Sequence, residues 1–222
     1  MERRWRSLPD EPGRLVRKSV VLSWSGGKDS ALALDALLQD PDVQVVGLLT
    51  SITTDYDRIS VHGVRRAMLE AQVERLGLPL FEISLDPSCT NRALPQVRYI
   101  AFGDLFLEDV RAYRERLLAS SGFEPLFPIW GLDTTALARR FIADGFSARL
   151  VCVDTTQLDA GFAGRLFDEE LLADLPSTTD PCGERGEFHT FVSNGPQFSA
   201  PIPYRVGEMV LREERFMFCD LE

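Results

Sequence analysis

Lysine, histidine and paired cysteines are nearly absent from this sequence. Lys18 and Lys28 are the only lysines among 24 basic residues, and His62 and His189 are the two histidines. The four cysteines form no C-x-x-C pair, so we expect no zinc site, and we expect the thiols to be reduced and buried. No apolar run is long enough to span a bilayer, and the charged start lacks the apolar segment of a secretory signal. These absences favour a cytoplasmic protein without membrane attachment.

Positive charge is scarce as well. The net charge is −10, and residues 1–18, which we expect to form a loose basic tail, contribute +3, so the rest carries −13. Affinity for nucleic acids depends largely on Lys and Arg contacts to phosphates. We therefore expect no stable complex with nucleic acid, and the sequence leaves open whether the protein is a monomer or a homodimer.

Strands and helices are predicted to alternate along the chain. Continuous apolar runs predict strands at 19–24, 43–50, 80–85, 97–104 and 148–155. Helices are predicted at 28–39, 64–76, 105–119 and 134–143. Fully apolar strands that alternate with helices are typical of a parallel sheet covered on both faces.

The composition changes after about Gly122, where glycine and proline become more frequent. We place a domain boundary there. Residues 19–122 are predicted to form an α/β domain with a Rossmann-like parallel sheet, and residues 123–222 a smaller α+β region that carries the acceptor substrate.

The corner between the first predicted strand and the first predicted helix, residues 23–32 (SWSGGKDSAL), combines glycines, hydroxyls and a lysine. Ligands bind at the carboxyl ends of parallel strands, glycines let the backbone approach closely, and the next helix offers free N–H groups. The corner is not a Walker A loop, because Leu22 and Asp29 stand where that pattern needs Gly and Ser/Thr. A tight turn with a serine cap is the alternative to a phosphate-binding loop. The predicted phosphate-binding residues are Ser25, Gly26, Gly27, Lys28, Asp29 and Ser30.

The corner sequence SGGKDS resembles the pyrophosphate loop of the N-type ATP pyrophosphatases, the PP-loop superfamily. In order and spacing, the segments 53–65, 102–117, 125–131 and 183–192 resemble the diphthine–ammonia ligase family of that superfamily. The resemblance covers nearly the whole chain except the tail. It implies an adenine nucleotide alpha-hydrolase-like fold, ATP and Mg²⁺ as cofactors, and a carboxylate acceptor and ammonia as the other reactants.

The resemblance also implies roles for individual residues. The corner and the end of the second strand, with Thr50 and Thr53, would hold ATP, and His62 would contact it. Lys28 would neutralise the departing pyrophosphate, and Asp29 would help to hold Mg²⁺, which needs few protein ligands. The threonines can equally be strand-edge residues, and His62 can be a surface histidine or a helix cap.

The acceptor side is predicted from the second half of the chain and from Asp104, which ends the fourth strand at the same sheet edge. If GEFHTFVS is a strand, Glu187 and His189 share one face roughly 6–7 Å apart. A carboxylate and an imidazole so placed suit ammonium capture or proton transfer, although most such pairs lie on a solvated face. We count as catalytic Lys28, Asp29, Asp104, Glu187 and His189. Expected substrate-binding residues are Glu184, Gly186 and Thr190.

These features predict an ATP-dependent amide ligase that uses ammonia and forms AMP and pyrophosphate. Two alternatives stay open. A non-catalytic adenine-nucleotide sensor would need the phosphate corner alone, and a PP-loop enzyme could modify another substrate such as tRNA.

Overall fold

The computed structural model describes residues 17–53, 58–59, 64–84 and 97–222 of the chain. The first half forms a six-stranded sheet in the order β3-β2-β1-β5-β6, and β4 also pairs with β2. Neighbouring strands run parallel except for the short β3, which is antiparallel to β2. Its strands are β1 (Lys18–Ser23), β2 (Val43–Thr53), β3 (Arg58–Ile59), β4 (Leu80–Ser84), β5 (Tyr99–Ala101) and β6 (Glu124–Leu126).

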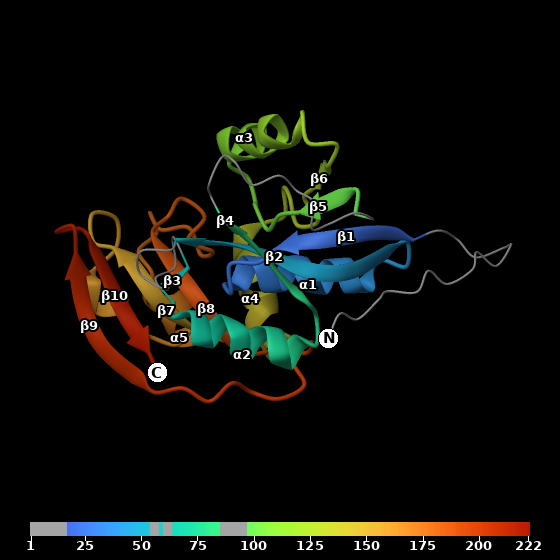
Figure 1. Cartoon of the computed structure of the whole chain (residues 1–222). Coiled ribbons are helices and arrows are strands. Elements are labelled where there is room, and N and C mark those ends of the chain that lie inside the picture. Colours follow the sequence, from blue (N-terminus) through green and yellow to red (C-terminus); the bar gives the residue numbers. More distant parts are fainter. Residues whose placement is uncertain (1–16, 54–57, 60–63, 85–96) are drawn as a thin grey trace, which may run out of the picture.

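Helices cover both faces of this sheet. The helices α1 (Lys28–Gln39) and α2 (Arg66–Leu76) lie on one face, and α3 (Glu108–Leu118) lies on the other (Figure 1). Parallel neighbours require crossover connections, and these helices supply them. The predicted α/β class with a Rossmann-like parallel sheet is confirmed.

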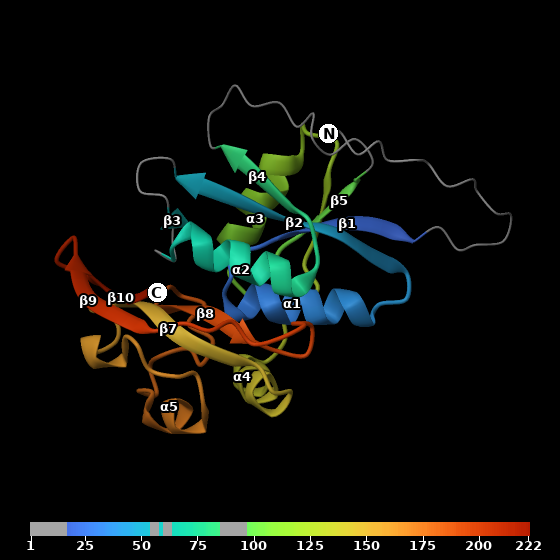
Figure 2. The ribbon, with the colours of Figure 1, turned by 60° about the horizontal axis from the view of Figure 1, so that its bottom comes forward.

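The second half forms a four-stranded antiparallel sheet in the order β8-β7-β10-β9. Figure 2 shows it beyond α1 and α2, with α4 (Thr134–Ala143) and α5 (Glu169–Asp174) on its far side. A short 3-10 helix, η1 (Ala160–Phe162), follows β7. The sheet strands are β7 (Ser147–Asp154), β8 (Phe188–Asn194), β9 (Val206–Arg212) and β10 (Phe216–Leu221). The predicted smaller α+β region is thus an antiparallel sheet with helices on its outer face, and β6 belongs to the first sheet.

Helix α1 lies between the two sheets (Figure 2). It packs against β1 and β2 on one side and β8 on the other. Seven of its twelve residues are buried, including Ala31, Leu34 and Leu37. A helix that is apolar on nearly every side belongs inside a core, which explains the sequence ALALDALL. The phosphate corner precedes this helix, so both sheets fix its position.

The core includes Val20, Val21 and Leu22 of β1, none of which has any exposed surface. In the described part of the chain, no helix has both the length and the apolar character of a membrane span. The described cysteines, Cys152, Cys182 and Cys219, are free and buried, as we expected.

Candidate active site

A cavity of about 390 Å³ opens where the carboxyl ends of β1, β2 and β5 meet the second sheet. Ser23 ends β1, Thr50 and Ser51 lie near the end of β2, and Phe102 follows β5. These residues line one side of the cavity, and residues 183–190 line the other. The cavity is therefore built jointly by the two halves of the chain, at the sheet edge where ligands of parallel α/β folds bind.

The loop between β1 and α1 requires glycine. Gly26 has a φ of 80°, in the left-handed region, and a Cβ atom there would lie 2.7 Å from Oε1 of Gln72. Gly27 is the N-cap of α1 and has no side chain to block the helix N-terminus. Gly103 approaches the same turn so closely that a Cβ atom would lie 2.9 Å from the carbonyl carbon of Asp29. The glycines thus let an anion approach the backbone at the start of α1 closely.

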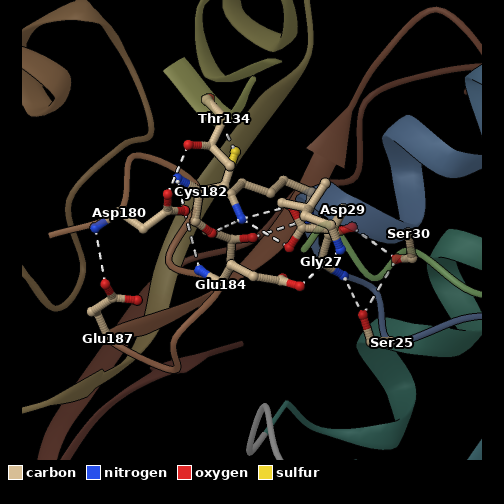
Figure 3. Close-up of polar contacts among 12 residues, drawn as sticks. Ser25, Gly27, Asp29, Ser30, Thr134, Asp180, Cys182, Glu184 and Glu187 are labelled. Atoms are coloured by element: carbon tan, nitrogen blue, oxygen red, sulfur yellow. Dashed lines mark hydrogen bonds and ion pairs between the residues drawn. The ribbon is translucent and has the colours of Figure 1, made fainter. Parts of the chain in front are cut away.

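The serine hydroxyls order the loop from within. Ser25 accepts a hydrogen bond from the amide of Gly27 at 3.3 Å and donates to the Ser30 hydroxyl at 3.3 Å. Ser30 donates to the Gly27 carbonyl at 2.8 Å. Figure 3 shows these contacts beside the acidic turn of the second half. The loop is therefore preorganised by its own side chains.

Gln72 of α2 joins the loop to the second sheet. The side chain is fully buried, accepts a hydrogen bond from Trp24 Nε1 at 3.0 Å, and donates to the carbonyls of Gly26 at 2.9 Å and Val192 at 2.7 Å. The amide of Val192 also donates to the Gly26 carbonyl at 2.9 Å. One buried amide group thus satisfies three partners from β8 and the β1–α1 corner. Sequence reasoning did not find Gln72, because a glutamine on an amphipathic helix gives no signal of burial.

Lys28 forms part of the cavity wall and is 2% exposed. Its Nζ donates to both carboxylate oxygens of Asp29, at 2.9 and 2.8 Å, and to the Cys182 carbonyl. Burial acts to lower the pKa of Lys28, but the nearby Asp29 carboxylate and other acidic groups outweigh it, so the pKa is raised. The ammonium is therefore charged, and it forms an ion pair with the Asp29 carboxylate.

Glu184 is the carboxylate of the second half that reaches the cavity. It accepts hydrogen bonds from the amides of Leu105, at 2.7 Å, and Phe106, at 3.4 Å. Burial raises the pKa of Glu184 to about 7; the Asp29 charge adds to this, and the two amide hydrogen bonds oppose it. Glu184 therefore changes charge near neutral pH, as a group that accepts and returns a proton must.

Glu187 lies elsewhere. It is 2% exposed, and its carboxylate accepts hydrogen bonds from the amides of Asp180 at 2.9 Å and Arg185 at 3.0 Å. Figure 3 shows its carboxylate at the amide of Asp180. We expected Glu187 and His189 to face the cleft together, but of these two only His189 is among the described residues that line the cavity. The amides of Asp180 and Arg185 have no partner in a helix or a sheet, and the Glu187 carboxylate accepts hydrogen bonds from both.

Asp104 and Arg114 face each other across the cavity wall, with Arg114 Nε 3.4 Å from Asp104 Oδ2. Burial raises the pKa of Asp104, although the Arg114 charge opposes the shift. The Arg114 guanidinium also lies 4.9 Å from the centre of the Phe102 ring. Arg114 was not predicted, because α3 carries several arginines at similar spacing and the sequence does not show which one turns inward.

Apart from Glu187, the predicted site residues differ in where they lie. Gly26 and Gly27 shape the loop without lining the cavity. Thr53 is the last residue of β2, and its side chain lies outside the described part of the structure. His62 lies outside the described residues. The structure brings together at the cavity Ser25, Lys28, Asp29, Ser30, Thr50, Asp104, Glu184, Gly186, His189 and Thr190.

No group of three or more His, Cys, Asp or Glu side chains in the described ranges is arranged to hold a metal ion. Asp29 nevertheless offers a half-buried carboxylate at the cavity, and Asp104 and Glu184 line the same space. Mg²⁺ takes oxygen ligands and usually keeps several waters when it is bound with phosphates, so a dedicated cage is not needed. The donor set thus fits a magnesium ion that arrives with a nucleotide.

Two family models match the chain. The model of the diphthamide synthase N-terminal domain matches residues 17–124, and the model of the diphthamide synthase C-terminal domain matches residues 133–218. No curated protein matches the sequence significantly. The two matched segments correspond to the two sheets and meet at the cavity.

Proposed function

Because the chain belongs to the diphthamide synthase family, we propose that it is an ATP-dependent ligase that amidates a carboxylate with ammonia and releases AMP and pyrophosphate. The observation that carries the proposal is one cavity with a phosphate-type loop on one wall and the ionisable Glu184 on the other. The acceptor is a carboxylate of the diphthine type or a smaller carboxylate metabolite, and the reaction would occur in the cytoplasm.

The charges in the cavity support binding of ATP as a magnesium complex. The described lining holds the carboxyl groups of Asp29, Asp104 and Glu184 against the cations of Lys28 and Arg114. This balance leaves no surplus positive charge for a triphosphate. Asp29 would hold the ion, directly or through water, and when bound the ion neutralises charge on the phosphates.

The first half-reaction activates the acceptor. A carboxylate oxygen attacks the α-phosphorus, the bond between that phosphorus and the α,β-bridging oxygen breaks, and pyrophosphate leaves with the bonding electrons. The positive N-terminal end of α1, which the glycines leave accessible, and the Lys28 ammonium would hold the departing group. The protein contributes mainly position and charge here, which suits a rigid loop.

The second half-reaction forms the amide. Ammonia attacks the acyl carbon, the bond from that carbon to the AMP oxygen breaks, and the nitrogen loses a proton. Glu184 would accept this proton, because its pKa of about 7 places it near neutrality. His189 lines the same cavity and would orient the acceptor or the ammonia.

The test measures AMP, pyrophosphate and amide after incubation with ATP, Mg²⁺, ammonium and candidate acceptors, including purified elongation factor. We expect AMP to form only when an acceptor is present, with one amide for each AMP. Lys28→Ala should weaken ATP binding and abolish most turnover, whereas Lys18→Ala, at the exposed start of β1, should behave like the wild type. ATP binding without AMP formation for every acceptor would contradict the proposal and favour a nucleotide sensor.

A further inference from the structure

Strand β9 is a long, unprotected sheet edge. It is the last strand in the order β8-β7-β10-β9, and it has seven residues without proline. The opposite edge is occupied, because the amide of Val192 in β8 donates to the Gly26 carbonyl. In the first sheet, the edge strand β6 has only three residues and contains Pro125. Short edge strands and prolines are devices that prevent pairing between edges, and β9 has neither.

The β9 edge is also the most apolar exposed segment of the described chain. Nine large hydrophobic side chains are exposed in the described part of the chain, and four of them lie in β9. The four are Val206, Met209, Val210 and Leu211. Free backbone groups beside exposed apolar side chains form a surface for strand addition.

We propose that β9 pairs with β9 of a second copy of this chain, antiparallel about a two-fold axis perpendicular to the sheet. The two four-stranded sheets then form one continuous eight-stranded sheet. The two-fold axis passes beside Val210, which faces Val210 of the other copy. Met209 then lies opposite Leu211, and Glu208 lies opposite Arg212.

Charge complementarity selects this register. A two-fold axis perpendicular to the sheet keeps each side chain on its own face, so two directly opposite residues are separated in sequence by an even number of positions or by none. The axis therefore passes beside one residue, which faces the same residue of the other copy. An axis at Glu208 would place two like charges opposite each other, and an axis at Met209 would place Val210 opposite Glu208. An axis at Leu211 would place Val210 opposite Arg212. The axis at Val210 alone pairs apolar with apolar and opposite charges with each other, the combinations that stabilise antiparallel pairs.

The two charged residues are available for this pairing. Neither Glu208 nor Arg212 forms an ion pair within the described part of the chain. Arg212 lies over the Phe218 ring of β10, with 5.9 Å from its guanidinium carbon to the ring centre. Because the pairing is two-fold symmetric, each dimer contains the Glu208–Arg212 pair twice, and one substitution changes both copies.

Disulfide trapping tests the register. Residues directly opposite in an antiparallel pair have Cα atoms about 4.5–5.5 Å apart, within the range of a disulfide. Under mild oxidation, Val210→Cys should therefore form a covalent dimer much faster than the wild type or Met209→Cys, whose residue faces Leu211 instead. Equal rates in all three proteins would overturn the proposed register.

Charge exchange tests the interface in the full-length protein. Sedimentation equilibrium should give about twice the chain mass of 24.9 kDa for the wild type. Glu208→Arg should raise the dimer dissociation constant about tenfold or more, and the double variant Glu208→Arg with Arg212→Glu should restore it. The control Leu117→Lys changes an exposed apolar residue of α3 and should leave the dimer intact. A wild type that is monomeric at about 100 µM would overturn the proposal. A double variant with a dimer dissociation constant as high as that of the single variant would overturn it as well.

Discussion

The backbone amide of Lys28 donates a hydrogen bond to the hydroxyl of Thr190 across 3.0 Å, although 162 positions separate the two residues. Lys28 opens α1 in the first half of the chain, and Thr190 lies in β8 of the second half. The hydroxyl of the second half therefore fixes the first turn of the helix that follows the phosphate loop. The loop is complete only when both sheets are folded together.

Replacing Thr190 should weaken nucleotide binding. Thr190→Val keeps the shape but removes the acceptor for the Lys28 amide, which leaves a buried N–H group without this partner. We expect a loss of about 1–3 kcal/mol in the free energy of unfolding and weaker ATP affinity. Thr190→Ser retains the hydroxyl and is the control. Calorimetry that finds equal ATP affinity for the valine and serine variants would contradict the role of this contact.

Gln72 should be among the most sensitive polar positions. Gln72→Leu leaves Trp24 Nε1 and the carbonyls of Gly26 and Val192 without these hydrogen bonds. The Gly26 carbonyl keeps the Val192 amide as a donor, but Trp24 Nε1 and the Val192 carbonyl lose this partner. Each buried group left unpaired costs about 1–3 kcal/mol, so urea unfolding should show a loss of several kcal/mol.

Gln72→Glu tests the hydrogen-bond donor of this side chain separately from its acceptor. It preserves an acceptor for Trp24 but loses the amide donor to the two carbonyls, so it should also be destabilised. A leucine variant as stable as the wild type would show that the loop does not depend on this side chain.

Glu184 should give the reaction a pH dependence near neutrality. The base form is present above its pKa of about 7, so amide formation should rise through that pH. Glu184→Gln cannot accept the proton, and its rate should fall by about 10²–10⁴-fold and lose this limb. A glutamine variant that keeps both the rate and the limb would exclude Glu184 as the proton acceptor.

Glu184 should also make the free energy of unfolding depend on pH, in the direction opposite to that of the rate. Its pKa is higher in the folded protein than the ordinary value of 4.5, so between these pH values the folded state binds more protons than the unfolded state. The contribution of Glu184 to the free energy of unfolding is thus fully present below pH 4.5 and lost as the pH rises to about 7. Urea unfolding across this range should show that decrease in the wild type, and the decrease should be smaller in Glu184→Gln.

Glu187 should matter for stability and little for chemistry. Glu187→Gln replaces one of the two carboxylate oxygens that accept from the amides of Asp180 and Arg185. We expect the free energy of unfolding to fall by about 1–3 kcal/mol, with a turnover per folded molecule close to that of the wild type. A large loss of turnover at unchanged stability would return Glu187 to a catalytic role.

The predictable parts of this molecule are those with local signals. The strand, glycine corner and helix at 19–39 were predictable because the apolar run, the turn residues and the helix lie together in the sequence. The alternation that gives the parallel sheet is local in the same sense.

The unpredictable parts depend on contacts between distant segments. The predicted orientation of the Glu187 side chain was wrong, because the 180–187 turn, and not strand alternation, directs it. Arg114 and Gln72 were missed because helix periodicity does not identify which polar side chain meets a distant strand. Strands β9 and β10 were not predicted, because they follow the turn-rich region 176–207 and their structure depends on their pairing with each other.

The most direct test of the central claim follows one oxygen atom. An acceptor with ¹⁸O in its carboxylate is incubated with the protein, ATP, Mg²⁺ and ammonium, and the products are analysed by mass spectrometry. If the carboxylate attacks the α-phosphorus, one ¹⁸O atom must appear in AMP, and the amide must keep the other. AMP without ¹⁸O, or label in pyrophosphate or free phosphate, would contradict activation of the acceptor at the α-phosphorus.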